Sequence, residues 1–281
     1  MTGLARKLAM SYAVVALMAA QSGCKSADKP PQADATPAPA PGAPSYQSLA
    51  QSHNDRVAKL QHMYATGSIE FRWKDDKGSH FENAHAELWL SLPRRTALRI
   101  DKVGEVVIWV GSDEERYWFF DLLSKETSLR VGRHDEPMRE IDAAAGLGLG
   151  PLALLDLLAL TPLPDAGESP PVTFDSARKA WMIEVPGNRH LRRMWFDVSS
   201  LLPSRVEIIN DAGQVQVSSS LREYQSVTQT GISPLAFPKL ATLVDIFTAD
   251  DDSRNGSVKL ALDEMTGDVE DQPMDRVFDL A

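Results

Sequence analysis

The chain has 281 residues, of which 29 are Lys or Arg and 39 are Asp or Glu, so its formal net charge is −10. An acidic chain without an arginine-rich stripe binds a polyanion poorly, which excludes nucleic acid as an expected partner. Its single cysteine, Cys24, has no second thiol to pair with, so the fold must hold without an internal disulfide.

The N-terminal segment, residues 1–23, is predicted to be a signal peptide. Arg6 and Lys7 precede an apolar run, Leu8 to Ala20, that is too short to span a bilayer comfortably. Small residues then come directly before Cys24, as they do at the cleavage site of a secretory signal. The segment resembles a bacterial lipoprotein signal, although Gln21 stands where leucine is usual. An ordinary secretory signal and an uncleaved membrane anchor are the alternatives.

This resemblance implies that Cys24 becomes the first residue of the mature chain and carries acyl chains that anchor it in a membrane. Lys25 directly after it implies the outer membrane, facing the periplasm. Residues 24–44 are then the lipidated cysteine and a tether rich in Pro and Ala, which reaches up to roughly 60 Å. Residues 45–281 are expected to form one domain, because no break in composition divides them.

The domain is expected to begin with an amphipathic helix and to continue with strands that have one wet face. The apolar face of the helix consists of Leu49, His53, Val57, Leu60 and Tyr64. In the strands that follow, the apolar side consists of Ile69, Phe71 and Trp73, then Ala84, Ala86, Leu88 and Leu90, whereas Trp89 falls on the polar side.

Further short strands follow, separated by turn residues. Two of them, VVIWV and YWFF, are apolar on both faces, so something must cover the second face. The candidate cover is a leucine-rich helix from Leu152 to Leu160, interrupted by Asp156. A second series of strands is expected after this helix, which gives about eleven strands in all. All six tryptophans are predicted to lie in strands. The fold class is therefore all-β with covering helices, most simply an antiparallel sheet.

The order of these parts resembles the LolA/LolB-like family of periplasmic lipoprotein carriers and receptors. The stretch LPRRTALRIDKVGEVVIWVGSDEERYWFFDL is similar to the family's region of paired apolar strands, and LREYQSVTQTGISPLAFPK, with Tyr224, Gly231 and Pro238, is similar to its late segment. The resemblance covers nearly all of 45–281. It implies a half-open antiparallel β-barrel whose concave, apolar side is capped by helices and accepts acyl chains.

The resemblance also implies which residues line such a site. The candidate cavity residues are Ile69, Phe71, Trp73, Leu88 and Leu90, with Leu152, Leu155 and Leu158 as plug or lid. In the membrane-anchored branch of the family, an apolar residue before a turn glycine contacts the bilayer, and Val103 before Gly104 occupies the corresponding place. The alternative for Val103 is an ordinary hairpin tip.

The sequence gives little sign of catalysis. Its six histidines form no zinc motif, no phosphate-binding or nucleophile motif occurs, and we expect neither a cofactor nor enzymatic activity. A hydrolase would need His134, Asp135 or Glu136 gathered with a nucleophile in a cleft.

The expected function is therefore a membrane-anchored lipid- or lipoprotein-binding protein, with acyl chains or lipoproteins as ligands and a periplasmic carrier protein as a further partner. The alternative is an envelope scaffold that uses the same fold with a filled cavity, which an exposed Trp89 or a rigid Leu152–Leu160 helix would favour.

Overall fold

The structure is a computed structural model. It describes residues 42–75, 78–122, 127–135, 151–165, 169–187, 190–248, 256–269 and 277–278. The predicted signal peptide, Cys24 and residues 24–41 of the tether lie outside these residues.

Thirteen strands form one sheet, in the order β6-β5-β4-β3-β2-β1-β13-β12-β11-β10-β9-β8-β7. The first six strands are β1 (His62–Asp75), β2 (Gly78–Ser91), β3 (Arg95–Lys102), β4 (Glu105–Ser112), β5 (Arg116–Asp121) and β6 (Ser128–Arg133). The others are β7 (Thr173–Asp175), β8 (Ala180–Pro186), β9 (Leu191–Asp197), β10 (Pro203–Ile209), β11 (Val215–Ser226), β12 (Lys239–Thr248) and β13 (Gly256–Thr266).

All pairings between these strands are antiparallel, and the β1–β13 pair joins the two halves of the sheet. Among the described residues β6 and β7 form the two edges and do not pair with each other, so the sheet is open. The predicted fold class is therefore confirmed. The number of strands is higher than the predicted eleven, because a strand as short as β7 has too few residues to show an alternating pattern.

Within the described residues, the α-helices α1 and α3 lie against this sheet. In α1 (Tyr46–Lys59) the hydroxyl of the N-cap residue Ser45 accepts a hydrogen bond from the Ser48 amide at 3.1 Å, and Leu49, His53 and Val57 are buried as predicted. The helix ends at Lys59, so the prediction that Tyr64 shares its face is wrong. Tyr64 belongs to β1, because the chain from His62 onward pairs with β2.

The second helix, α3 (Pro151–Leu157), is shorter than the predicted Leu152–Leu160 helix. The backbone of Ala159 has a φ of 53°, which no helix continues through, and Pro162 follows soon after. Leu158 and Leu160 therefore lie beyond the helix, although both are still buried. A single turn of 3₁₀-helix, η1 (Pro234–Ala236), lies between β11 and β12.

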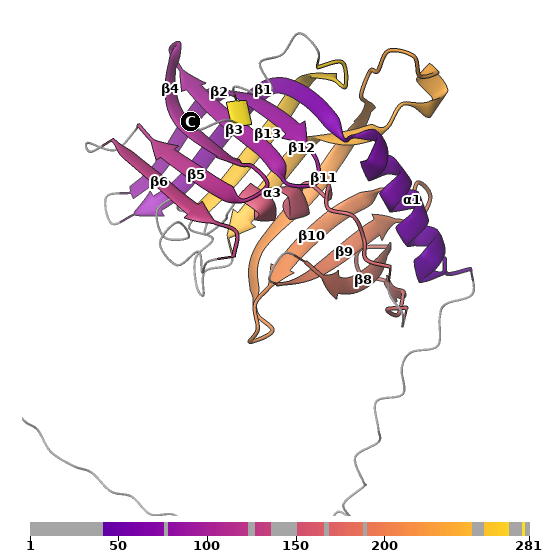
Figure 1. Ribbon diagram of the computed structural model, residues 1–281. Helices are drawn as coiled ribbons and strands as arrows, with labels where there is room; N and C mark the ends of the chain where they lie inside the picture. Colours follow the sequence, from indigo (N-terminus) through magenta and orange to yellow (C-terminus); the bar gives the residue numbers. More distant parts are fainter. Residues whose placement is uncertain are drawn as a thin grey trace, which may run out of the picture. The chain divides into compact units, whose positions relative to one another are not determined.

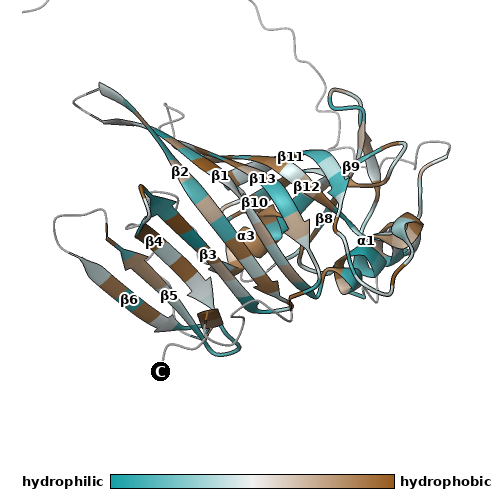
Figure 2. Cartoon of the chain, turned by 90° about the horizontal axis from the view of Figure 1, so that it is seen from above, coloured by the Kyte–Doolittle hydropathy of each residue, from teal (hydrophilic) through white to brown (hydrophobic). Residues whose placement is uncertain are grey.

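The strand register separates two faces of the sheet. On the concave face, Ile69 pairs with Ala84, and Ala86 pairs with Ile100, which in turn pairs with Ile108. These side chains join α3 in the main hydrophobic core, and both views place α3 within the curve of the sheet (Figures 1 and 2). Brown and paler residues alternate along β6, as the period of two of a strand requires (Figure 2).

The convex face has a smaller core of its own around Trp89. Trp89 packs with Ala97, Trp118 and Phe278, and only 4% of its surface is exposed. Sequence alternation places Trp89 correctly on the face opposite Leu88 and Leu90, but that face is not polar at this point, because Val277 and Phe278 cover it. All six tryptophans lie in strands, as predicted.

No helix within the described residues is both long and apolar enough to cross a membrane.

Candidate functional site

The candidate site is the concave face around α3. Leu155 and Leu157 of the helix, and Leu158 and Leu160 after it, are buried in the main core. The helix contacts β10 on one side of the curved sheet and β3 and β4 on the other. Because these strands belong to different halves of the sheet, α3 bridges both halves from the inside.

A buried ion pair fixes the C-terminal end of α3 to the sheet. Asp156 lies 3.1 Å from Nη1 of Arg192 and 2.9 Å from Nε2 of His190, and the side chains of Asp156 and Arg192 are almost completely buried. Arg192 comes from β9 and points to the concave face, because its strand neighbours in the register are Val185 and Ile208. A charged aspartate in an apolar helix is tolerated here because its partners lie across the core.

Burial alone would raise the pKa of Asp156. The hydrogen bond from His190 and the positive charge of Arg192 outweigh this and hold the pKa below its usual value. Burial lowers the pKa of Arg192, and the charge of Asp156 opposes that shift. The pair is therefore charged at neutral pH, in a core where either charge alone would be strongly unfavourable.

The segment that follows α3 is held by main-chain hydrogen bonds to side chains of α1 and β9. Arg192 donates to the carbonyls of Thr161 at 3.2 Å and Pro162 at 3.1 Å. Asn54 of α1 both donates to the Leu163 carbonyl at 2.9 Å and accepts from the Leu163 amide at 2.8 Å. Tyr46 donates its hydroxyl to the Pro164 carbonyl at 2.7 Å.

Two further residues of α1 complete this attachment. Arg56 donates to the Ala159 carbonyl at 2.5 Å, and Nε2 of His53 lies 3.1 Å from the Thr161 carbonyl, to which it donates. Burial, and next the charge of Arg56, hold the pKa of His53 well below its usual value, so its ring is neutral. We call residues 156–164, held in this way, the clamped segment.

The N-terminal end of α3 is different, because its side chains are only partly buried. Leu152, Ala153 and Leu154 pack against the main core but keep some solvent exposure. Across from them, Ile108 and Val110 of β4 are also partly buried, and both lie on the concave side of the register. Incompletely covered apolar groups on a helix and on the strand it contacts form an apolar surface that a ligand could cover.

The structure brings most of the predicted cavity and lid residues to this concave face. Ile69, Leu88, Leu90, Leu155 and Leu158 are all buried in the main core, whereas Phe71 and Leu152 are partly buried against it. Trp73 is 39% exposed and stacks on His80 with ring centroids 5.0 Å apart, near the end of the β1–β2 hairpin.

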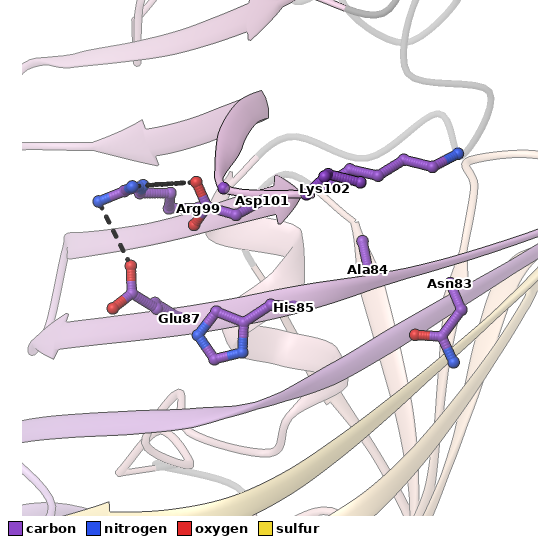
Figure 3. Close-up of a pocket in the computed structure, with 9 residues that line it drawn as sticks. Asn83, Ala84, His85, Glu87, Arg99, Asp101 and Lys102 are labelled. Atoms are coloured by element: carbon purple, nitrogen blue, oxygen red, sulfur yellow. Dashed lines mark hydrogen bonds and ion pairs between the residues drawn. The ribbon is translucent and has the colours of Figure 1, made fainter.

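A polar groove of about 590 Å³ lies on and beside the convex face (Figure 3). Arg99 crosses it, with Nη2 2.9 Å from Asp101 and Nη1 3.5 Å from Glu87. The groove is lined by Asn83, Ala84, His85, Glu87, Arg99, Asp101, Lys102, Val103 and Gly104. Arg99 and Lys102 are both paired with carboxylates, since Lys102 pairs with Glu82.

Val103 forms the tip of the β3–β4 hairpin at one end of this groove. Its side chain is 98% exposed and its φ is 55°, a conformation that a β-branched residue adopts only under strain. Gly104, with a φ of 83°, supplies the second left-handed position of the turn. Val103 thus occupies the hairpin tip that the sequence predicts, and its contact with a bilayer remains a prediction.

The residues considered for catalysis show ordinary structural contacts. Nε2 of His134 lies 3.0 Å from the Asp113 carbonyl, and Asp135 pairs with Arg133, while Glu136 lies outside the described residues. His80 lies opposite Trp73 on the concave face, and His85 lies opposite Asp101 on the convex face. The two histidines are five residues apart in one strand, so they point to opposite faces of the sheet. Within the described part of the chain, no group of three or more His, Cys, Asp or Glu could hold a metal ion.

Comparison with known proteins finds similarity at the level of solved structures. A LolA superfamily protein from Nitrosomonas europaea is 12% identical, with 79% of this chain and 93% of that chain covered and a TM-score of 0.48. A domain provisionally named an outer membrane lipoprotein-sorting protein domain, from Vibrio parahaemolyticus, is 11% identical, with 79% and 91% covered and a TM-score of 0.46. A DUF1329 family protein from Desulfovibrio piger is 12% identical, with 80% and 92% covered and a TM-score of 0.49.

No protein-family model matches the chain, and a search of curated proteins gives no match. At identities of 11–12% and TM-scores below 0.5, the structural similarities do not assign the chain to a family.

Sequence reasoning finds the leucines of the site but misses its polar clamp. In the sequence, Asp156 is a single acidic residue within an apolar run, and Arg192 is one of two adjacent arginines in a predicted strand. Neither residue is marked locally as part of a site. An aspartate within a buried helix does signal that a cationic partner must exist. Which residue supplies that charge depends on the strand register, which the sequence does not show.

Proposed function

We propose that the protein is a membrane-tethered lipid-binding protein of the bacterial envelope, of the LolA/LolB-like type, that accepts an acyl chain on its concave face. It forms and breaks no covalent bond and needs no cofactor. Cys24 carries the lipid anchor, and residues 24–44 hold the domain on the periplasmic side of the outer membrane.

One observation carries this proposal: the partly exposed apolar surface between the N-terminal end of α3 and β4. Leu152 and Leu154 on the helix and Ile108 and Val110 on the strand keep solvent exposure inside an otherwise buried core. Covering apolar surface is favourable by about 0.8 kcal/mol per CH₂ group, so a fatty-acyl chain is a fitting occupant. Of the two features that would favour a scaffold with a filled cavity, the buried Trp89 removes one, whereas the clamped segment retains the other.

The exposed, strained Val103 supports a role at a membrane surface. The hairpin turn requires a positive φ at this position, so the surrounding structure holds the β-branched Val103 in a strained conformation with its side chain in solvent. A lipid-anchored protein that passes acyl chains to a bilayer would use such a tip for contact, and a periplasmic carrier would deliver the chain.

The test is titration with a fluorescent fatty acid of the full chain in which Cys24→Ser removes the lipid anchor, so that the protein carries no acyl chain of its own and is purified without detergent. We expect saturable binding that Leu154→Glu and Ile108→Glu each weaken, because each places a charge beside the acyl chain. Leu129→Glu is the matched control, since Leu129 is 53% exposed on the convex side of β6. Circular dichroism checks that each variant is folded. Absence of binding, or equal weakening by the control, would refute the proposal.

A further inference from the structure

The loop between β11 and β12 presents an apolar tip to solvent. Leu235 is 100% exposed and Ile232 is 37% exposed, and residues 229–238 contain no charged side chain. Figure 1 shows this loop, with the short helix η1, projecting beyond the end of α1. Two exposed apolar side chains on one short uncharged loop form an apolar tip that a membrane or a partner could cover.

Hydrogen bonds hold the base of this loop in place. The amide of Thr230 donates to Asp268 at 2.8 Å, and its hydroxyl donates to the same carboxylate at 2.9 Å. Gln229 donates to the Lys59 carbonyl at 2.6 Å, and the amide of Val227 donates to the Pro238 carbonyl at 2.9 Å. The loop is therefore held in place on both sides, and Leu235 cannot fold back onto the core without breaking these bonds.

We propose that the tip Gly231–Ala236 is a membrane-contact element that places Leu235 among the acyl chains of a lipid bilayer. This inference rests on the membrane tether of the proposed function and is independent of acyl binding at the concave face. A lone apolar wedge needs no matching pocket in a bilayer, whereas a stable protein interface needs roughly 1,000 Å² or more of buried surface.

The charges at the base of the loop also favour contact with a lipid bilayer. Lys59 and Lys239 are exposed on either side of it, and the Lys59 ammonium lies 3.5 Å from the Ala236 carbonyl. Asp268, the acidic group nearby, is engaged by Thr230. Lysines beside an apolar tip would meet the phosphates of anionic headgroups, which adds to the affinity for a membrane surface.

The experiment uses the full chain with its one cysteine replaced, Cys24→Ser, so that a new cysteine can carry an environment-sensitive fluorophore. The label is placed by Ser233→Cys, because the Ser233 side chain caps nothing. The matched control label is placed by Ala212→Cys, in the exposed β10–β11 turn. The probe membrane is a vesicle of phosphatidylethanolamine and phosphatidylglycerol, with and without nitroxide-bearing lipid.

We expect the label at 233 to shift to shorter wavelength on vesicles and to be quenched by the nitroxide lipid, and the label at 212 to stay unchanged. Adding Leu235→Asp should reduce the ratio of inserted to free loop roughly tenfold or more, since burying a leucine is favourable by that amount. Because Leu235 touches no core residue, this variant should keep its fold by circular dichroism.

A label at 233 that is quenched no more than the label at 212 would overturn the inference. A shift that requires added periplasmic protein instead of vesicles would also overturn it, in favour of a protein partner. The fatty-acid titration separates the two proposals, because Leu235→Asp should leave acyl binding unchanged. Loop insertion without fatty-acid binding would refute the proposed function alone.

Discussion

Replacing Asp156 by Asn tests whether the clamp holds α3 in place. The substitution keeps the shape of the side chain and removes its charge, which leaves the buried guanidinium of Arg192 without a counter-charge. Breaking a buried ion pair from one side costs about 3–5 kcal/mol. The free energy of unfolding of a domain is roughly 5–15 kcal/mol, so loss of the Asp156–Arg192 ion pair should remove a large share of it.

Urea unfolding, followed by tryptophan fluorescence, measures the loss as a shift of the midpoint. The matched control is Glu184→Gln, which removes the carboxylate that pairs with Arg193 on the surface of β8 and β9. Because both of these side chains are substantially exposed, the control should lose about 0–1 kcal/mol. Equal losses in the two variants would show that the buried pair is no more important than an exposed one, and the reasoning would fail.

Arg192→Met gives an independent check on the same clamp. It removes the partner of Asp156 and also the hydrogen bonds to the Thr161, Pro162 and Pro186 carbonyls. Since each buried carbonyl left without a donor adds about 1–3 kcal/mol, this variant should lose more stability than Asp156→Asn. A smaller loss would mean that the carbonyls find other donors and that the clamped segment is not held by Arg192.

The remaining predictions concern pH, the core and the convex face. The pKa of Asp156 is lower in the folded than in the unfolded state, so its charge stabilises the fold fully above about pH 5 and less as the pH falls through the folded pKa. In urea titrations at decreasing pH, the difference in stability between the wild type and Asp156→Asn should therefore shrink. Leu155→Ala should cost about 2–5 kcal/mol in thermal or urea unfolding, whereas Leu129→Ala on the exposed side of β6 should stay within about 0.5 kcal/mol. Phe278→Ala should expose Trp89 and increase the quenching of tryptophan fluorescence by acrylamide, and unchanged quenching would contradict the observed packing.

Strand positions could be predicted because the information is local. In β1 the alternation of Ile69 and Phe71 with polar residues assigns the faces correctly. The end of α1 could not be located in the same way, since Tyr64 continues the helical pattern although it belongs to a strand. Pairing with β2 decides its place, and such pairing is a property of the whole sheet.

The candidate site could be predicted only in its apolar half. Leu155 and Leu158 are identifiable because clustered leucines must be buried, whatever surrounds them. The polar half depends on contacts between residues far apart in the chain: Arg56 of α1 with the Ala159 carbonyl, and Arg192 of β9 with Asp156. Neither pairing leaves a pattern in the local sequence, because each is fixed by where α1 and β9 lie in the folded sheet.

The clamp also constrains how the proposed site can work. The hydrogen bonds from α1 and β9 hold residues 156–164, so α3 cannot swing outward from its C-terminal end without exposing the buried Asp156 and Arg192. Leu152 and Leu154 lie on the part of α3 that these bonds do not reach. Entry of an acyl chain should therefore require only side-chain movement at the N-terminal end of the helix. In that arrangement the leucine-rich segment would be a fixed plug, and its partly exposed N-terminal end would be the surface that the proposed acyl chain covers.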